Sequence, residues 1–462
     1  KALAIGDYHA QFGQGLTFWT GLAYGKSADA VFIKKVPLGL KPYTSSDENL
    51  FLRGVATTIG LNKFEITGFY SKKKIDANVK NQDTLSNEDV FVSSFDETGL
   101  HTTPAELSKK DALGENIFGG RIAYKTDQLN IGATAAHYIY DIYIQKTPNI
   151  YNKFEFSGEE NTNIGIDYSY IFRNVNFFGE VSRSQNGGMA YLNGILVSLD
   201  QSVNFAILHR NYGKDFQSFY STGFSEGSST YNEKGIYIGL ETKFDKKWLL
   251  RGYVDNFWFP WLKSYTTAPS KGVEYLSELH YIPSKKVSMY GRVKIEVKQT
   301  DNTDASNMIN YLQKLEKQNY RFHISYDVTP YLSLKNRFEY MQYVKGNKNP
   351  EKGYILYQDA IFKPRKLPFT LNIRYAIFNT DSYNTAIYAY ETDVLYAYSV
   401  PSYYYKGSRG YVVLHYRISR NFDLWLRYSR TFYANKNVIG SDLTEIQANH
   451  KSEIKAQLRI RF

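Results

Sequence analysis

The stretch that decides the fold is the last one, Ile454-Lys455-Ala456-Gln457-Leu458-Arg459-Ile460-Arg461-Phe462. Apolar and polar residues alternate along it, and a period of two predicts a β-strand with one apolar and one charged face. A closing aromatic residue on such a strand is typical of transmembrane β-barrels of the Gram-negative outer membrane. We therefore expect Leu458, Ile460 and Phe462 to belong to the terminal strand that closes a barrel.

The same alternation recurs along the chain, and the connections between the alternating segments are of two kinds, short and long. From Ile117 onward, segments of about ten residues alternate between tight turns and longer connections. Tight turns are expected near residues 127–128, 173–174, 200–201, 245–246, 283–284, 329–330, 364–365 and 420–421. Longer connections are expected over 141–160, 213–232, 259–270, 301–318 and 435–447. A soluble sandwich shares the alternation but has no reason to sort its loops in this way. The pattern predicts an all-β chain, a large antiparallel transmembrane barrel of roughly 20 to 24 strands with short periplasmic turns and long extracellular loops.

Composition agrees with a barrel. The 462 residues include no Cys, 42 Tyr and 29 Phe, and the formal net charge is +11. No apolar run approaches the roughly 18 residues that a transmembrane helix needs. Tyr suits the boundary between hydrocarbon and headgroups, although a Tyr-rich soluble β-protein such as a sugar-binding propeller is the alternative. Lys and Arg are spread over the whole chain, so the positive charge is a weak signal for nucleic acid.

We expect residues 1–462 to form a single outer-membrane barrel domain. Two irregular stretches, 28–49 and 72–116, are predicted to be long loops or segments inside the lumen. Gln313–Gln318 is predicted to form a short helical turn. The chain begins in the middle of a strand-like pattern, so we expect an upstream module to precede Lys1.

Several motifs carry a family resemblance. They are Gly6–Tyr8, Phe12–Leu16, Gly25–Ser27, Lys41–Ser45, Gly99–Glu106, Pro260–Leu262, Ala268–Gly272, Tyr390–Tyr396, Asn449–Glu453 and Gln457–Arg459. With these motifs the chain resembles the large carboxy-terminal region of outer-membrane proteins that carry a helix-hairpin-helix, ComEA-like, DNA-binding module. The resemblance implies an outer-membrane location, and it implies DNA binding only through the module upstream of Lys1.

Charged residues on the polar faces of the strands are the best functional candidates. By parity they point into the lumen, and they are Arg292, Lys294, Glu296, Arg321, Asp327, Lys335, Arg337, Glu339, Arg374, Arg417, Asp423, Arg427, Arg459 and Arg461. In an open pore such residues would select permeating solutes by the sign of their charge. In a filled barrel they would pair across strands, and cross-strand pairing is the interpretation that we favour.

The aromatic cluster of Phe257, Trp258, Phe259 and Trp261 joins a strand to a long connection. We expect it to form an interface girdle, with an aromatic platform for a sugar as the alternative. The eight His residues show no zinc-site spacing, and neither a nucleophile elbow nor a phosphate loop is present. The sequence therefore predicts no catalytic residue, metal or cofactor.

The predicted function is that of a non-catalytic outer-membrane barrel, acting as a passage or as a scaffold in a membrane assembly. The alternatives are a barrel linked to DNA uptake through the upstream module and an outer-membrane hydrolase. The expected partners are outer-membrane lipid and lipopolysaccharide, together with other outer-membrane or periplasmic proteins. Nucleic acid is expected only through the upstream module.

Overall fold

A computed structural model describes residues 2–23, 25–44, 49, 51–81, 90–302 and 311–461. Strands dominate this part of the chain, which forms one sheet of 23 strands and a separate sheet of two. No helix among the described residues has the length and apolar character needed to cross a membrane. The chain divides into two compact units, and each is described by itself. The first consists of Lys1–Glu241, Tyr253–Val273 and Gln299–Leu312, and the second of Thr242–Gly252, Glu274–Lys298 and Gln313–Phe462.

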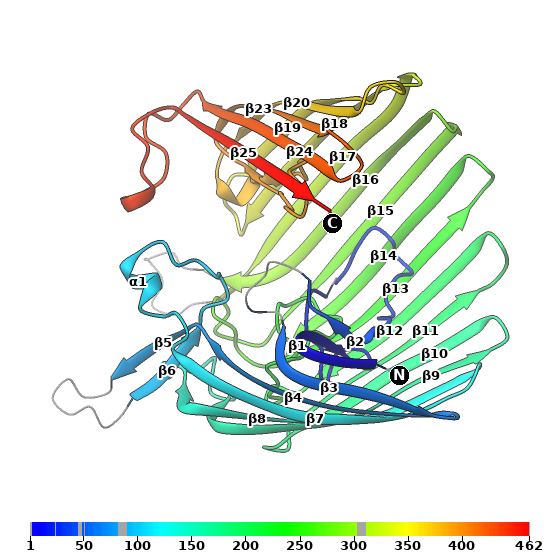
Figure 1. The fold of residues 1–462 in the computed structure, drawn as a ribbon, viewed down its shortest axis with the longest axis vertical. Helices are drawn as coiled ribbons and strands as arrows, with labels where there is room; N and C mark the ends of the chain where they lie inside the picture. Colours follow the sequence, from blue (N-terminus) through cyan, green and yellow to red (C-terminus); the bar gives the residue numbers. More distant parts are fainter. Residues whose placement is uncertain are drawn as a thin grey trace. The chain divides into compact units, whose positions relative to one another are not determined.

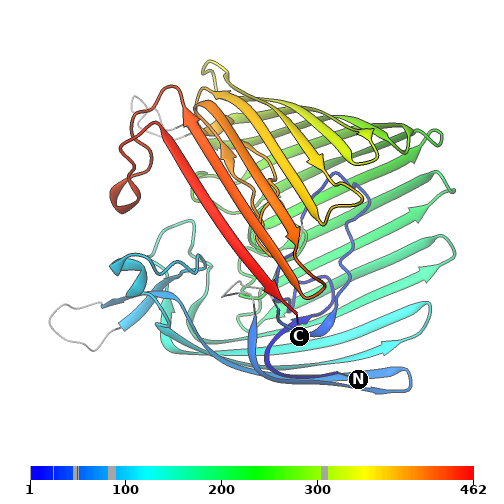
Figure 2. The same cartoon turned by 45° about the horizontal axis from the view of Figure 1, so that its top comes forward.

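The strands of the first unit pair mostly with their neighbours in sequence. They are β1 (Ala2–Gln11), β2 (Gly39–Pro42), β3 (Leu52–Leu61), β4 (Phe64–Ile75), β5 (Ala77–Asn81), β6 (Val90–Phe95), β7 (Leu113–Lys125), β8 (Leu129–Gln145), β9 (Ser157–Phe172), β10 (Val175–Ser184), β11 (Met189–Ser198) and β12 (Val203–Tyr212). The antiparallel order is β2–β1–β3–β4–β7–β8–β9–β10–β11–β12. The hairpin β5–β6 extends β4 and is followed by the one-turn helix α1 (Pro104–Leu107) (Figure 2).

Several strands contribute residues to both units: β13 (Glu233–Lys243), β14 (Trp248–Phe259), β15 (Ser270–Ser284), β16 (Val287–Asp301) and, by Leu312 alone, β17 (Leu312–Thr329). The rest of the chain belongs mainly to the second unit. It comprises the remainder of β17, β18 (Leu332–Lys345), β19 (Glu351–Phe362), β20 (Phe369–Thr380), η1 (Tyr383–Thr385), β21 (Ile387–Tyr388), β22 (Ser402–Tyr403), β23 (Lys406–Arg417), β24 (Phe422–Tyr433), η2 (Asp442–Thr444) and β25 (His450–Ile460). Figure 1 shows β17–β18–β19–β20–β23–β24–β25 in this antiparallel order, with β25 in red.

The two faces of these strands differ in the way that their sequence predicts. In β24, Leu426 and Tyr428 are exposed on one face, whereas Asp423 and Arg427 on the opposite face are buried. The register with β25 keeps each face continuous, because Leu424 lies opposite Leu458 and Asp423 lies opposite Arg459. We call the two faces the apolar side and the charged side. Exposed apolar side chains on long antiparallel strands meet lipid, while the polar backbone groups are satisfied between strands.

This architecture confirms the predicted fold class, a large antiparallel transmembrane β-barrel. The predicted connection 213–232 fills the interval between β12 and β13, and turns 173–174 and 330–331 separate the strands of their hairpins. Leu458 and Ile460 lie on the apolar side of β25. Phe462, the predicted closing aromatic, lies outside the described residues.

Three local predictions are wrong or incomplete. Gln313–Gln318 is not a helical turn but the start of β17, because Leu315 and its neighbours pair with β18. The predicted loop 72–116 contains the end of β4, the hairpin β5–β6, α1 and the start of β7. Lys73 belongs to β4, where it lies opposite Glu115 of β7, and its ammonium donates hydrogen bonds to the carbonyl oxygens of Asn49 (3.0 Å) and Phe51 (2.8 Å). The predicted loop 28–49 contains β2, although residues 45–48 lie outside the described part.

Candidate functional site: an inward loop held by charged strands

The connection between β20 and β23, residues 381–405, folds back over the charged side of the second unit. We call it the inner loop. The short strands β21 and β22 pair within it, and the amide of Glu391 donates to the carbonyl oxygen of Ser399 at 2.9 Å. Its buried residues Ile387, Ala389 and Tyr403 form an apolar cluster with Ile355 and Phe378 of the sheet. The loop is therefore packed onto the sheet by its own side chains.

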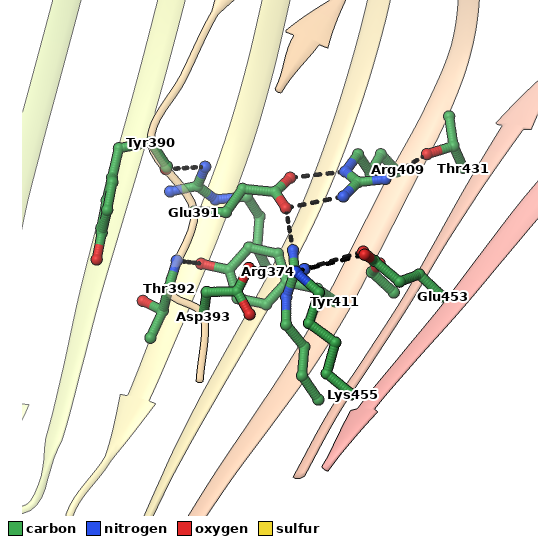
Figure 3. Close-up of polar contacts among 12 residues, drawn as sticks. Arg374, Tyr390, Glu391, Thr392, Asp393, Arg409, Tyr411, Thr431, Glu453 and Lys455 are labelled. Atoms are coloured by element: carbon green, nitrogen blue, oxygen red, sulfur yellow. Dashed lines mark hydrogen bonds and ion pairs between the residues drawn. The ribbon is translucent and has the colours of Figure 1, made fainter. Parts of the chain in front are cut away.

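Glu391 carries the central carboxylate of the loop and is fully buried. Arg409 donates to it through Nε (2.7 Å) and Nη2 (2.9 Å), and Arg427 donates through Nη2 at 2.5 Å. The hydroxyl of Tyr403 donates to the same carboxylate at 2.6 Å. Figure 3 shows the carboxylate of Glu391 pointing at the guanidinium groups from the adjacent strands. A bidentate guanidinium contact of this kind is among the strongest polar interactions in proteins.

Asp393 makes the second ionic contact of the loop. Its Oδ2 accepts from Arg427 Nη1 at 3.1 Å and from Lys455 Nζ at 2.9 Å. Arg374 adds a third attachment, donating from Nη1 to the carbonyl oxygen of Tyr390 at 2.7 Å. We call the contacts of Tyr390, Glu391 and Asp393 with the strands the loop latch.

The latch keeps its acid ionised. Burial by itself raises the pKa of Glu391, but the hydrogen bond and charge of Arg409, together with Tyr403 and Arg427, outweigh burial and lower that pKa below 4.5. Glu391 is therefore an anion at neutral pH, bound to two guanidinium groups.

The predicted lumen charges lie on the charged side of the second unit, and most are paired there. Several pairs join neighbouring strands: Arg292 with Glu278, Lys294 with Glu274 (3.1 Å), Arg321 with Glu339 (2.7 Å) and Arg374 with Asp359 (2.5 Å). Glu296 pairs with Lys298 of its own strand (2.5 Å), and Arg337 lies 3.9 Å from Glu339. Asp327 accepts from the hydroxyl of Ser333, and Lys335 lies opposite Asp359 in the register.

A second group of these charges surrounds Asp423 near the tight turn of β23 and β24. Arg459 contacts the carboxylate at 2.6 Å, Arg461 at 3.3 Å and Arg417 at 3.7 Å. Arg417 and Arg461 remain more than half exposed, with 63% and 53% of their side-chain surface accessible. The candidate residues thus fall into three groups. Most are paired on the charged side, Arg427 belongs to the latch, and Arg417 and Arg461 are exposed at the turn.

The predicted aromatic girdle is divided by strand parity. Trp258 lies on the apolar side and is 42% exposed, as a girdle residue should be. Phe257 and Phe259 point the other way and are buried, with Lys26 and Lys263 over their rings. Trp261 follows the strand and packs edge-on against Phe154. Successive residues of one strand point to opposite faces, so Phe257 and Phe259 cannot lie on the apolar side with Trp258, and the prediction of a common girdle is wrong for these two.

The first unit has an inward segment of its own, residues 12–38. The carboxylate of Glu180 on β10 accepts from the backbone amides of Gln14 (2.5 Å), Leu16 (3.1 Å) and Thr17 (2.8 Å). Farther along the segment, the hydroxyl of Tyr237 donates to the carbonyl oxygen of Ala30 at 2.8 Å. Burial lowers the pKa of Lys35 to about 8, only partly offset by Glu180. This segment overlaps the predicted lumen stretch 28–49 but begins earlier in the chain.

Sequence reasoning missed the residues that carry the site. Tyr390–Tyr396 contributes to the family resemblance, yet nothing in its pattern indicates that Glu391 and Asp393 fold against the strands. The available signal was length, because the 25 residues between β20 and β23 far exceed the tight turn on the other side of β20. This connection also carries three acids, Asp381, Glu391 and Asp393, between two strands that contain Arg374 and Arg409.

No family model matches the chain, and no curated protein matches it. Among solved structures, the siderophore receptor PirA of Acinetobacter baumannii is similar, with a TM-score of 0.47, 8% identity and coverage of 89% of this chain and 71% of that one. The ferric-catecholate import receptor Fiu of E. coli K12 gives a TM-score of 0.45 at 10% identity, covering 92% and 76%. The FrpB iron transporter of Neisseria meningitidis gives 0.43 at 10% identity, covering 89% and 72%. No conclusion about cargo follows from likenesses of this size, and the resemblance to helix-hairpin-helix proteins stays a prediction.

Proposed function

We propose that the protein is a non-catalytic passage through the outer membrane and that the inner loop obstructs it. The supporting observation is the loop latch. The cations that hold Glu391 and Asp393 come from three different strands, β23, β24 and β25. A loop that served only to connect β20 and β23 would not need to pair with β24 or β25.

The ionic character of the latch favours a passage over a rigid scaffold. A purely structural loop is stabilised as well by apolar packing, because desolvation offsets much of the gain from buried ion pairs. Ionic contacts, in contrast, can be released by competing charge without loss of the fold. The charged side that the loop would uncover carries the remaining arginines and acids of the second unit, which would select solutes by charge. The partners in this proposal are outer-membrane lipid and lipopolysaccharide.

Planar-bilayer conductance of the purified chain tests the proposal. We compare the wild type with the double variant Glu391→Gln/Asp393→Asn, which keeps side-chain volume but removes both carboxylates. Glu445→Gln is the matched control, because Glu445 is an exposed acid of the connection between β24 and β25, away from the latch, and its side chain accepts from nearby Gln447. We expect longer or larger open events in the double variant alone. Silence in all three proteins would rule out a passage and leave the scaffold.

A further inference from the structure

A cavity of about 310 Å³ lies beside the latch, where β24 ends and β25 begins. Its walls come from the inner loop and from strands β20, β23, β24 and β25. The rings of Tyr404 and Tyr433 line it, with centroids 6.3 Å apart. Hydroxyl groups from both the loop and the strands complete the lining, among them Thr431. The volume is at the lower end of the roughly 300–1,000 Å³ usual for small-molecule sites.

The charges around this cavity are unequal. Arg409, Lys451 and Lys455 line it, and Glu453 is the one acid among its described lining residues. Lys451 is exposed, whereas the side chain of Arg409 is 15% exposed. Once Glu391 and Asp393 are released from Arg409 and Lys455, three cations face one acid in one small space, which favours a ligand with negative charge.

The remaining lining residues indicate which class of molecule would carry that negative charge. Phenol rings offer flat faces for the C–H surface of a sugar ring, and their hydroxyls, with those of Ser and Thr, can exchange hydrogen bonds with sugar hydroxyls. A wholly apolar ligand would cover these polar groups without pairing them, which costs free energy. The combination suits a carbohydrate that carries a carboxylate or a phosphate group.

Two cations belong both to the cavity and to the latch. Arg409 holds Glu391 at 2.7 Å, and Lys455 holds Asp393 at 2.9 Å. We propose that an anionic carbohydrate binds in this cavity and releases the inner loop by taking Arg409 and Lys455 away from Glu391 and Asp393. This proposal rests on the proposed function, because it supplies the solute class and the trigger for the passage. The ligand opens the loop only to the extent that it binds the released state more tightly than the latched state.

Isothermal titration calorimetry of the full chain in detergent tests the binding step without reference to conductance. The probes are digalacturonate for the carboxylate, glucose 6-phosphate for the phosphate and maltose as a neutral sugar. We expect one or both anions to bind at one site per chain, with affinity at least tenfold above that of maltose. Lys451→Gln, which leaves the latch contacts intact, should weaken anion binding at least fivefold. Arg420→Gln, an exposed arginine at a distant tight turn, is the matched control and should change nothing.

The outcomes separate the two proposals. Equal affinity for maltose and the anions, or equal loss in Lys451→Gln and Arg420→Gln, would overturn the site. Preference for digalacturonate or for glucose 6-phosphate identifies the charged group and supports it. Anion binding in a chain that conducts under no condition would refute the passage while leaving the site. Conductance of the double latch variant in a chain that binds neither anion would refute the site and leave the passage.

Discussion

Replacing Glu391 by Gln is the sharpest test of the latch. The substitution keeps volume but turns one carboxylate oxygen into an amide that faces the guanidinium donors of Arg409 and Arg427. Removing one side of a buried ion pair costs about 3–5 kcal/mol. Arg427 still contacts Asp393 and Glu453 in the variant, both at 3.1 Å. We therefore expect the free energy that holds the loop on the strands to fall by about 3 kcal/mol, the lower end of that range. At 1.4 kcal/mol per factor of ten, the loop should open on the order of 100-fold more often.

Hydrogen exchange measures this opening directly. The amide of Glu391 is bonded to the carbonyl of Ser399 at 2.9 Å, so it exchanges when the loop leaves the strands. We expect exchange of the peptide containing this amide to accelerate on the order of 100-fold in Glu391→Gln, by the energy argument above. The control Glu445→Gln should exchange at the wild-type rate in the same peptide.

A change of less than about threefold in Glu391→Gln would refute the reasoning, since 3 kcal/mol predicts far more. It would show that the apolar cluster of Ile387, Ala389 and Tyr403 holds the loop without help from the ions. Equal acceleration in Glu445→Gln would instead point to general loosening of the loops.

Three further predictions concern the latch and the two faces. The pKa of Glu391 in the folded protein is lowered below 4.5, so the stability that the ionised carboxylate gives the closed loop is complete above pH 4.5 and is lost as the pH falls through the folded pKa. Hydrogen exchange of the inner loop, corrected for the intrinsic rate, should therefore be faster at pH 3.5 than at pH 6. Leu426→Arg puts a charge in the middle of the apolar side and should cost about 2–4 kcal/mol in bilayer unfolding by urea. Arg210 is fully buried and forms ion pairs with Glu233 (2.5 Å) and Asp255 (2.8 Å). Arg210→Met should therefore lower the stability of the first unit by about 3–5 kcal/mol in the same assay. A change below about 1 kcal/mol would contradict this prediction.

The strand pattern could be predicted from the sequence because the pleat itself has a period of two. Leu424, Leu426 and Tyr428 lie on one face of β24 wherever that strand is placed, and a membrane requires that face to be apolar. Tight turns could be found for the same local reason, since a few residues such as Arg173 and Asn174 suffice to reverse a strand. The same period of two puts Trp258 on the apolar side and Phe257 on the other. This difference could have been predicted from the sequence, but the prediction of a common girdle overlooked it.

Only the tertiary structure decided where the irregular segments go. Glu391 meets Arg427 across 36 residues, and Glu180 meets Gln14 across 166, so no local period links them. A strand shows which of its faces is charged, but the partner of each charge depends on register and on which loop folds inward. The backbone geometry of a strand produces a repeating pattern in the sequence, so the two faces of each strand can be predicted from it. The long-range packing and ionic contacts that place a loop produce no such pattern.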